Sequence, residues 1–177
     1  MTDLPPLRRL LKSRPERCDG AVILDYDARL IRRKRLLTAQ GRGFMVDLPE
    51  VTNLDAWWGF ELEDGTVLEI VPADEALVEV TGDLPRLAWH IGNRHTPCQI
   101  ESHRLLIRHD HGIEAMLAQL GARLRPLTGP FTPEGGAYGL GRTMGHDHGA
   151  SHEHEHGHGH KHNHDHTHHD HSHGSAV

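Results

Sequence analysis

Histidines crowd one end of this sequence at a density that indicates metal chemistry. Residues 145–174 hold fourteen of the chain's 19 histidines, most at every second position: His146, His148, His152, His154, His156, His158, His160, His162, His164, His166, His168, His169, His171 and His173. A neutral imidazole offers a nitrogen lone pair that suits nickel, copper and zinc, whereas magnesium and calcium prefer oxygen. Tracts of this composition are typical of metal binding, so these side chains are predicted ligands.

The same tract lacks every residue needed to build a core. It contains no Leu, Ile, Val, Phe, Tyr or Trp. A segment that buries no apolar surface cannot offset the entropy lost on ordering, so residues 141–177 are predicted to be a disordered His-rich tail in the absence of a ligand. Three other interpretations stay open: a purification tag, a solvated pH-sensitive tail, and polyanion binding by protonated histidines.

Three histidines elsewhere have a spacing that could hold a metal ion. His95 follows an expected helix, and one imidazole becomes a pair if a two-fold homodimer brings a second copy to the axis. The alternative for His95 is a polar residue near a helix C-terminus. His109 and His111 flank Asp110 and form a plausible partial site, with a helix N-cap and two exposed histidines as the alternative. His90 is a weaker candidate, and no role is assigned to His103.

Two helices and several strands must position these side chains. Asp83 and Pro85 mark the start of a helix, and a second helix is expected after Asp110 because apolar residues recur there at helical spacing. Strands are expected at 76–80, 98–102, 103–108 and 122–127. The resulting order, β-α-β-β-α-β, is the ferredoxin-like arrangement. We therefore predict a metal-binding domain over residues 75–140.

Residues 1–74 are expected to form a separate β-rich domain. Short apolar segments alternate with turn signals, of which Asp64–Gly65 is the strongest hairpin signal, and this spacing favours a small sandwich or barrel. The fold class is therefore α+β. The basic run 32–35 is interpreted as exposed charges on an edge strand.

Several classes of protein are disfavoured. The formal net charge of −6 gives no basic surplus for nucleic acid, and no P-loop motif is present. No apolar run approaches the roughly 18 residues of a membrane span, and residues 1–18 hold no secretory core. Two distant cysteines indicate reduced thiols, so a cytoplasmic location is expected. No catalytic set of Ser/His/Asp or Cys/His stands out, so an enzyme is not expected.

Two motifs give the chain a resemblance to a known family. The stretch W-H-I-G-N-R-H-T-P at 89–97, the R-H-D-H-G at 108–112 and the His-rich C-terminus resemble the UreE urease accessory proteins, which are nickel metallochaperones. The resemblance covers about residues 18–140. It implies that His95 binds metal at a dimer interface and that His109 and His111 form a peripheral site. It also implies an N-terminal domain that binds peptides.

The resemblance further implies a cargo and partners. Ni²⁺ would be the physiological ion, with zinc or copper possible in vitro, because imidazole also binds both. Handover would go to the urease accessory GTPase UreG and to the complex of apo-urease with its accessory proteins. A storage or detoxification buffer for nickel or zinc, with no dedicated partner, stays open as the alternative function.

Overall fold

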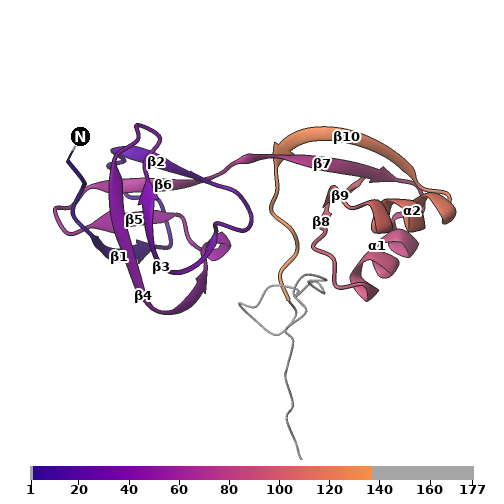
Figure 1. Cartoon of the computed structure of the whole chain (residues 1–177), viewed down its shortest axis with the longest axis horizontal. Helices are drawn as coiled ribbons and strands as arrows, with labels where there is room; N and C mark the ends of the chain where they lie inside the picture. The colour runs from indigo at the N-terminus through magenta and orange to yellow at the C-terminus, as the bar shows by residue number, and fades with distance from the viewer. Residues whose placement is uncertain (1, 137–177) are drawn as a thin grey trace, which may run out of the picture. The chain divides into compact units, whose positions relative to one another are not determined.

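The first half of the chain is made of strands. The computed structural model describes residues 2–136, and Figure 1 shows their arrangement. A four-stranded sheet has the order β1-β5-β6-β2, and β3 pairs with β4 in a second sheet. The elements are β1 (Leu7–Leu11), β2 (Gly20–Leu24), β3 (Leu30–Leu37), β4 (Gly43–Asn53), the 3₁₀ turn η1 (Leu54–Ala56), β5 (Gly59–Leu62) and β6 (Val67–Pro72).

Both of these sheets contribute to one apolar core. Val22 and Phe60 of the larger sheet and Phe44 of the smaller one are fully buried in the same cluster. The Asp64–Gly65 hairpin signal is confirmed, since β5 and β6 pair in antiparallel fashion across it. Gly65 has a φ of 85°, a conformation that glycine adopts without the steric cost of a Cβ atom.

The second half of the described chain alternates strands and helices. Its elements are β7 (Asp74–Thr81), α1 (Leu84–Asn93), β8 (Gln99–Ile100), β9 (Leu105–Arg108), α2 (His111–Gln119) and β10 (Arg123–Pro130). The strands form a sheet of order β10-β7-β9-β8 in which every neighbouring pair is antiparallel. The order along the chain is therefore the predicted β-α-β-β-α-β, and the fold is α+β.

Side chains on the two faces of this second sheet pack into different apolar cores. Val78 and Ile107 pack with Ile91 of α1 and Leu117 of α2, and Figure 1 shows both helices on that face. Leu77 and Leu106, which have the opposite parity on their strands, pack with Tyr26 and Phe131. The helices that carry the candidate ligands are thus anchored by buried residues of the sheet.

One buried arginine ties the end of β10 to the N-terminal strands. Arg29 is 1% exposed, and its Nε lies 2.6 Å from Asp55 Oδ1. The same guanidinium donates hydrogen bonds to the carbonyl oxygens of Leu24 and Phe131. A buried charge needs both an ion partner and satisfied hydrogen bonds, and Arg29 has both.

Two strands of the second sheet, β8 and β9, are shorter than expected, whereas β7 and β10 are longer. The strand expected at 98–102 is only Gln99–Ile100, and its partner begins at Leu105. The reason is a tight connection, in which the N–H of Glu101 donates to the carbonyl of Arg104 at 3.0 Å and the Arg104 guanidinium pairs with Glu101. His103 therefore lies in a turn and not in a strand.

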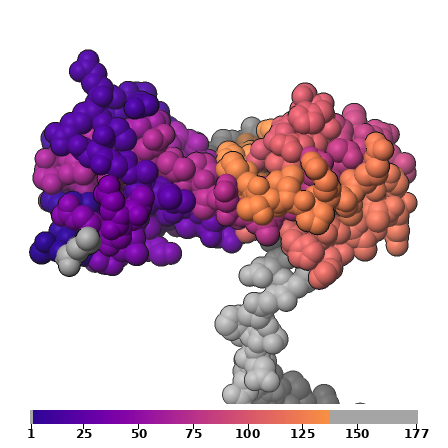
Figure 2. Space-filling view, turned by 90° about the horizontal axis from the view of Figure 1, so that it is seen from above, coloured from indigo at the N-terminus to yellow at the C-terminus, as the bar shows by residue number. Residues whose placement is uncertain are grey.

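The edge strand β10 lies at the surface. Most of its residues are exposed, and Figure 2 shows them in orange. Pro126 and Pro130 belong to this strand, and proline is tolerated at sheet edges because it lacks the N–H that a further strand would require.

Two sequence predictions are not tested by this fold. The tail predicted over residues 141–177 lies outside the described residues, as do the four preceding residues. The boundary between residues 74 and 75 stays a prediction. Among residues 2–136, no helix is long and apolar enough to cross a membrane.

Candidate metal-binding sites

His95 lies directly after α1 in an unusual backbone conformation. The helix ends at Asn93, and His95 has a φ of 55°, which places it in the left-handed region. The N–H of His95 donates to the carbonyl of Gly92 at 2.9 Å, and the N–H of Thr96 donates to the carbonyl of Ile91 at 3.4 Å. This pair of hydrogen bonds is the Schellman motif, in which the left-handed position is usually glycine.

A histidine at this position is held at an energetic cost. The left-handed conformation costs an L-residue roughly 1–2 kcal/mol, which glycine avoids. Strained residues of this kind occur at functional sites more often than elsewhere. The partial negative charge of the helix C-terminus also favours a cation nearby, and His95 is exposed to solvent. The local structure thus suits His95 to meet a metal ion at the surface.

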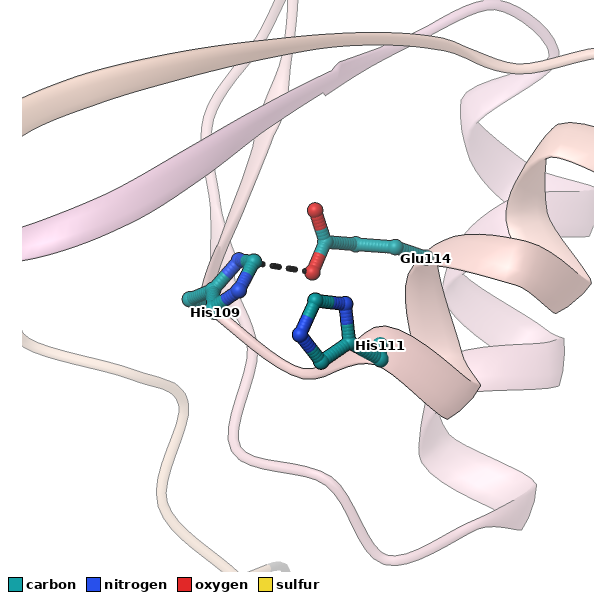
Figure 3. Close-up of side chains that lie close together, drawn as sticks. All are labelled: His109, His111 and Glu114. Atoms are coloured by element: carbon teal, nitrogen blue, oxygen red, sulfur yellow. Dashed lines mark ion pairs between the residues drawn. The ribbon is translucent and has the colours of Figure 1, made fainter.

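A second group of ligands lies at the start of α2. In the described part of the chain, His109, His111 and Glu114 are the three His, Cys or carboxylate side chains that converge, with ligand atoms within 4.8 Å of one another. The His109 and His111 rings have centroids 4.7 Å apart. Figure 3 shows the three side chains pointing toward one another, His109 from the segment before the helix and the others from its first turn.

The chain around His109 is fixed on both sides. Arg108 ends β9 and forms an ion pair with Asp27 at 2.8 Å. Asp110 caps α2 by accepting a hydrogen bond from the N–H of Ile113 at 2.9 Å, so the N-cap that the sequence offers as the alternative for this segment is present. The imidazole of His109 therefore projects from a short segment that is tied down at its two neighbours.

Glu114 is the ligand candidate that the sequence analysis missed. Its Oε2 atom lies 2.8 Å from Nδ1 of His109. The signal was present in the sequence, because residues three apart on a helix face the same side and Glu114 is three residues after His111. Two nitrogen donors and one oxygen donor suit nickel, copper or zinc.

The other histidines of the described residues lie outside this group. His90 packs edge-on against Trp89, with ring centroids 4.9 Å apart, and His103 lies 3.4 Å from the Ser102 hydroxyl. His95 is not part of the group either. The fourteen predicted ligands from His146 to His173 lie beyond the residues that the structure describes.

Thiolate ligation has no support at Cys98, three residues after His95. Burial raises the pKa of the Cys98 thiol to about 12, so the thiol stays protonated at neutral pH. Metals bind the thiolate form, which is scarce under these conditions. The candidate donors in the described residues are therefore imidazoles and a carboxylate.

Comparison with known proteins identifies the family. The sequence model described as "UreE urease accessory protein, C-terminal domain" matches residues 67–175. A protein of Cereibacter sphaeroides named Urease accessory protein UreE is 59% identical over 151 residues, which cover 84% of this chain and 83% of the relative.

Two further relatives carry the same name. The protein of Ruegeria pomeroyi is 57% identical over 148 residues, covering 82% of this chain and 99% of the relative. That of Rhodobacter capsulatus is 62% identical over 131 residues, covering 74% of this chain and 84% of the relative. The chain therefore belongs to the family of UreE urease accessory proteins, which are accessory chaperones and not enzymes.

Proposed function

We propose that this protein carries Ni²⁺ and delivers it for maturation of the urease active site. His95 from each chain of a homodimer forms a transferable site, and the His-rich tail supplies further ligands or a reservoir. The metal passes in the cytoplasm to the urease accessory GTPase UreG and then to apo-urease with its accessory complex. His109 and His111 form an additional, peripheral site.

The observation that carries this proposal is the conformation of His95. An exposed imidazole occupies a position where the hydrogen-bond pattern calls for glycine. Backbone strain at this position is understandable if the ring has a task that glycine cannot perform. Binding a cation at the negative end of α1 is such a task.

A homodimer supplies more metal ligands at His95 than one chain can. Divalent ions of this class take about four to six ligands, and a two-fold axis doubles each donor that lies near it. The Trp89 side chain, on the last two turns of α1, is 63% exposed. Aromatic side chains are enriched where protein chains meet, so an exposed tryptophan on the helix that precedes His95 agrees with a second copy packing there.

Ligand exchange explains how a carrier could both hold and release its cargo. Neighbouring imidazoles can leave and replace one another singly, so the ion need not pass through an unliganded state. The alternating histidines of residues 145–174 offer such a series of donors. This mechanism requires transfer to the GTPase to be faster than free dissociation of the ion.

Nickel titration and transfer by matched variants test the proposal. We compare the wild-type chain with His95→Asn and, as a control, His103→Asn, because both remove one exposed imidazole and asparagine tolerates the left-handed conformation. Bound nickel per dimer and oligomeric state are measured together, and stopped-flow spectroscopy follows transfer to the GTPase. We expect His95→Asn to lose the dimer's transferable ion and His103→Asn to match the wild type.

The same measurements separate a carrier from a buffer. A full-length variant with asparagine at all fourteen tail histidines should still bind and transfer an ion through His95 if the protein is a carrier. Loss of nearly all function in that variant, with His95→Asn indistinguishable from wild type, would establish the buffer instead. Transfer no faster than free dissociation would eliminate direct handover.

A further inference from the structure

Glu114 holds His109 through one carboxylate oxygen. Oε2 lies 2.8 Å from Nδ1 of His109 and accepts a hydrogen bond from the backbone N–H of Asp110 at 3.0 Å. The Glu114 side chain is 21% exposed, whereas the His109 side chain is 56% exposed. The His109 side chain therefore still reaches solvent while it contacts a less exposed partner.

The position of Glu114 is set by the helix and not by the histidine. It lies in the first turn of α2, between the buried residues Ile113 and Leu117 that anchor the helix to the sheet. A negative charge in the first turn is favoured by the positive end of the helix dipole. The carboxylate is thus in place before any ion binds.

This contact decides which nitrogen of His109 is available to a metal. A neutral imidazole that donates a hydrogen bond through Nδ1 keeps its lone pair on Nε2. Histidines that bind metals commonly donate their other N–H to a carboxylate, which fixes the tautomer and ring orientation and makes the ligand more basic. The Glu114–His109 pair has the partners and the distance of that arrangement.

We propose that Glu114 is a positioning residue for a cation site on His109 and His111. Its carboxylate fixes His109 as the Nδ1–H tautomer and presents Nε2 to an ion that His111 also binds. The proposal depends on the peripheral site in the proposed function, but not on His95 or on delivery to urease. The ligand class is a divalent ion of borderline softness, such as Ni²⁺ or Zn²⁺.

Direct ligation by Glu114 is the competing arrangement. Zinc-to-ligand distances of about 2.1 Å would place two ligand atoms of a tetrahedral site about 3.4 Å apart, whereas Oε2 and Nδ1 lie 2.8 Å apart in the metal-free protein. In that case the ion would replace the Nδ1 proton and bind Oε2. The structure favours positioning, because Oε2 already accepts a hydrogen bond from the backbone N–H of Asp110 while it lies 2.8 Å from Nδ1 of His109.

Site-resolved NMR of the full chain tests the proposal with Zn²⁺ as a diamagnetic probe. The ¹⁵N shifts of the His109 and His111 rings report the tautomer in the metal-free protein and the nitrogen that binds zinc. The tail histidines, observed in the same spectra, serve as an internal scale for free zinc. The variants are Glu114→Ala, Glu114→Gln and, as a control for lost charge, Glu50→Ala at an exposed site outside this segment.

We expect the wild type to show the Nδ1–H tautomer and zinc on Nε2 of His109. Glu114→Ala should lose that tautomer bias and need about 10- to 100-fold more zinc for half-occupancy of the site. Glu114→Gln keeps an acceptor oxygen, so its zinc concentration for half-occupancy should lie between those of the wild type and Glu114→Ala. This variant also keeps the test possible if Glu114→Ala does not fold. Glu50→Ala should match the wild type.

Each contrary result has a distinct meaning. Zinc on Nδ1 in the wild type, or a Glu114→Ala titration equal to wild type, would overturn the positioning role and leave the site in place. If the His109 and His111 signals stay unchanged while the tail fills, the peripheral site and the positioning role both fail. None of these results alters the test of His95 described above.

Discussion

Replacing His95 by glycine should stabilise the protein while removing its proposed metal ligand. The left-handed conformation at φ 55° costs an L-residue roughly 1–2 kcal/mol, and glycine relieves that cost. Glycine also makes the unfolded chain more flexible, which takes back about 0.4–1 kcal/mol. The net expectation for His95→Gly is a gain of about 0.5–1 kcal/mol in the free energy of unfolding.

Alanine provides the matched comparison at the same position. His95→Ala also removes the imidazole, but its Cβ atom keeps the steric cost, so no gain is expected. The two variants should therefore differ by about 1 kcal/mol, or about 3–5 °C in melting temperature for a folded region of this size. Thermal unfolding followed by circular dichroism in excess chelator measures this difference without any contribution from bound metal.

The comparison isolates function from stability. Both variants should lose the same His95-dependent nickel, although one is more stable than the wild type and the other is not. Equal melting temperatures for the glycine and alanine variants would refute the strain argument. A wild-type level of nickel transfer in His95→Gly would refute the argument that the ring, and not the backbone, is what this position requires.

Three further predictions follow from particular contacts. Asp110→Ala removes the N-cap carboxylate that accepts a hydrogen bond from the N–H of Ile113 at 2.9 Å. Chemical denaturation should show that the free energy of unfolding falls by about 1 kcal/mol. Hydrogen bonds from Arg104 and Arg125 lower the pKa of Glu79 below its ordinary value of 4.5. Its stabilising effect is therefore present above pH 4.5 and is lost as the pH falls through the lowered pKa, so the difference in melting temperature between wild type and Glu79→Gln should shrink over that range. Nickel load, measured by equilibrium dialysis, should fall steeply from about pH 7 to pH 5, because protons and metal compete for the same imidazole lone pair; a constant load would assign the ion to carboxylates or backbone.

The order of elements around the site could be predicted because local signals agree with packing. Asp83 marks the start of the first helix, and Asp110 is the N-cap in the alternative interpretation of the second. Each accepts a hydrogen bond from the backbone N–H of the residue three positions later. Both helices bury the residues that recur at helical spacing, Leu87 and Ile91 in one and Ile113 and Leu117 in the other. Such signals depend on residues only a few positions apart.

These local signals could not predict which distant strands pair with each other. A turn follows Leu24, but the strands that it joins belong to different sheets: β2 pairs in parallel with β6, and β3 pairs with β4. Apolar alternation indicates that a strand has a buried face without indicating its partner. β1, in the stretch 7–11, also carries no alternating pattern of its own.

The backbone at His95 illustrates why a candidate site needs more than its motif. The sequence places a histidine after a helix, and a helix that ends in a Schellman motif calls for a residue with positive φ. Glycine is available three residues earlier, at Gly92, where the helix continues, and histidine occupies the position at which glycine would relieve strain. The residue that the backbone conformation favours, glycine, therefore differs from the residue present, histidine, at this one position of the segment. Such disagreement is expected where a side chain is retained for chemistry and not for stability, which is the physical reason for testing His95 by glycine substitution before any other change.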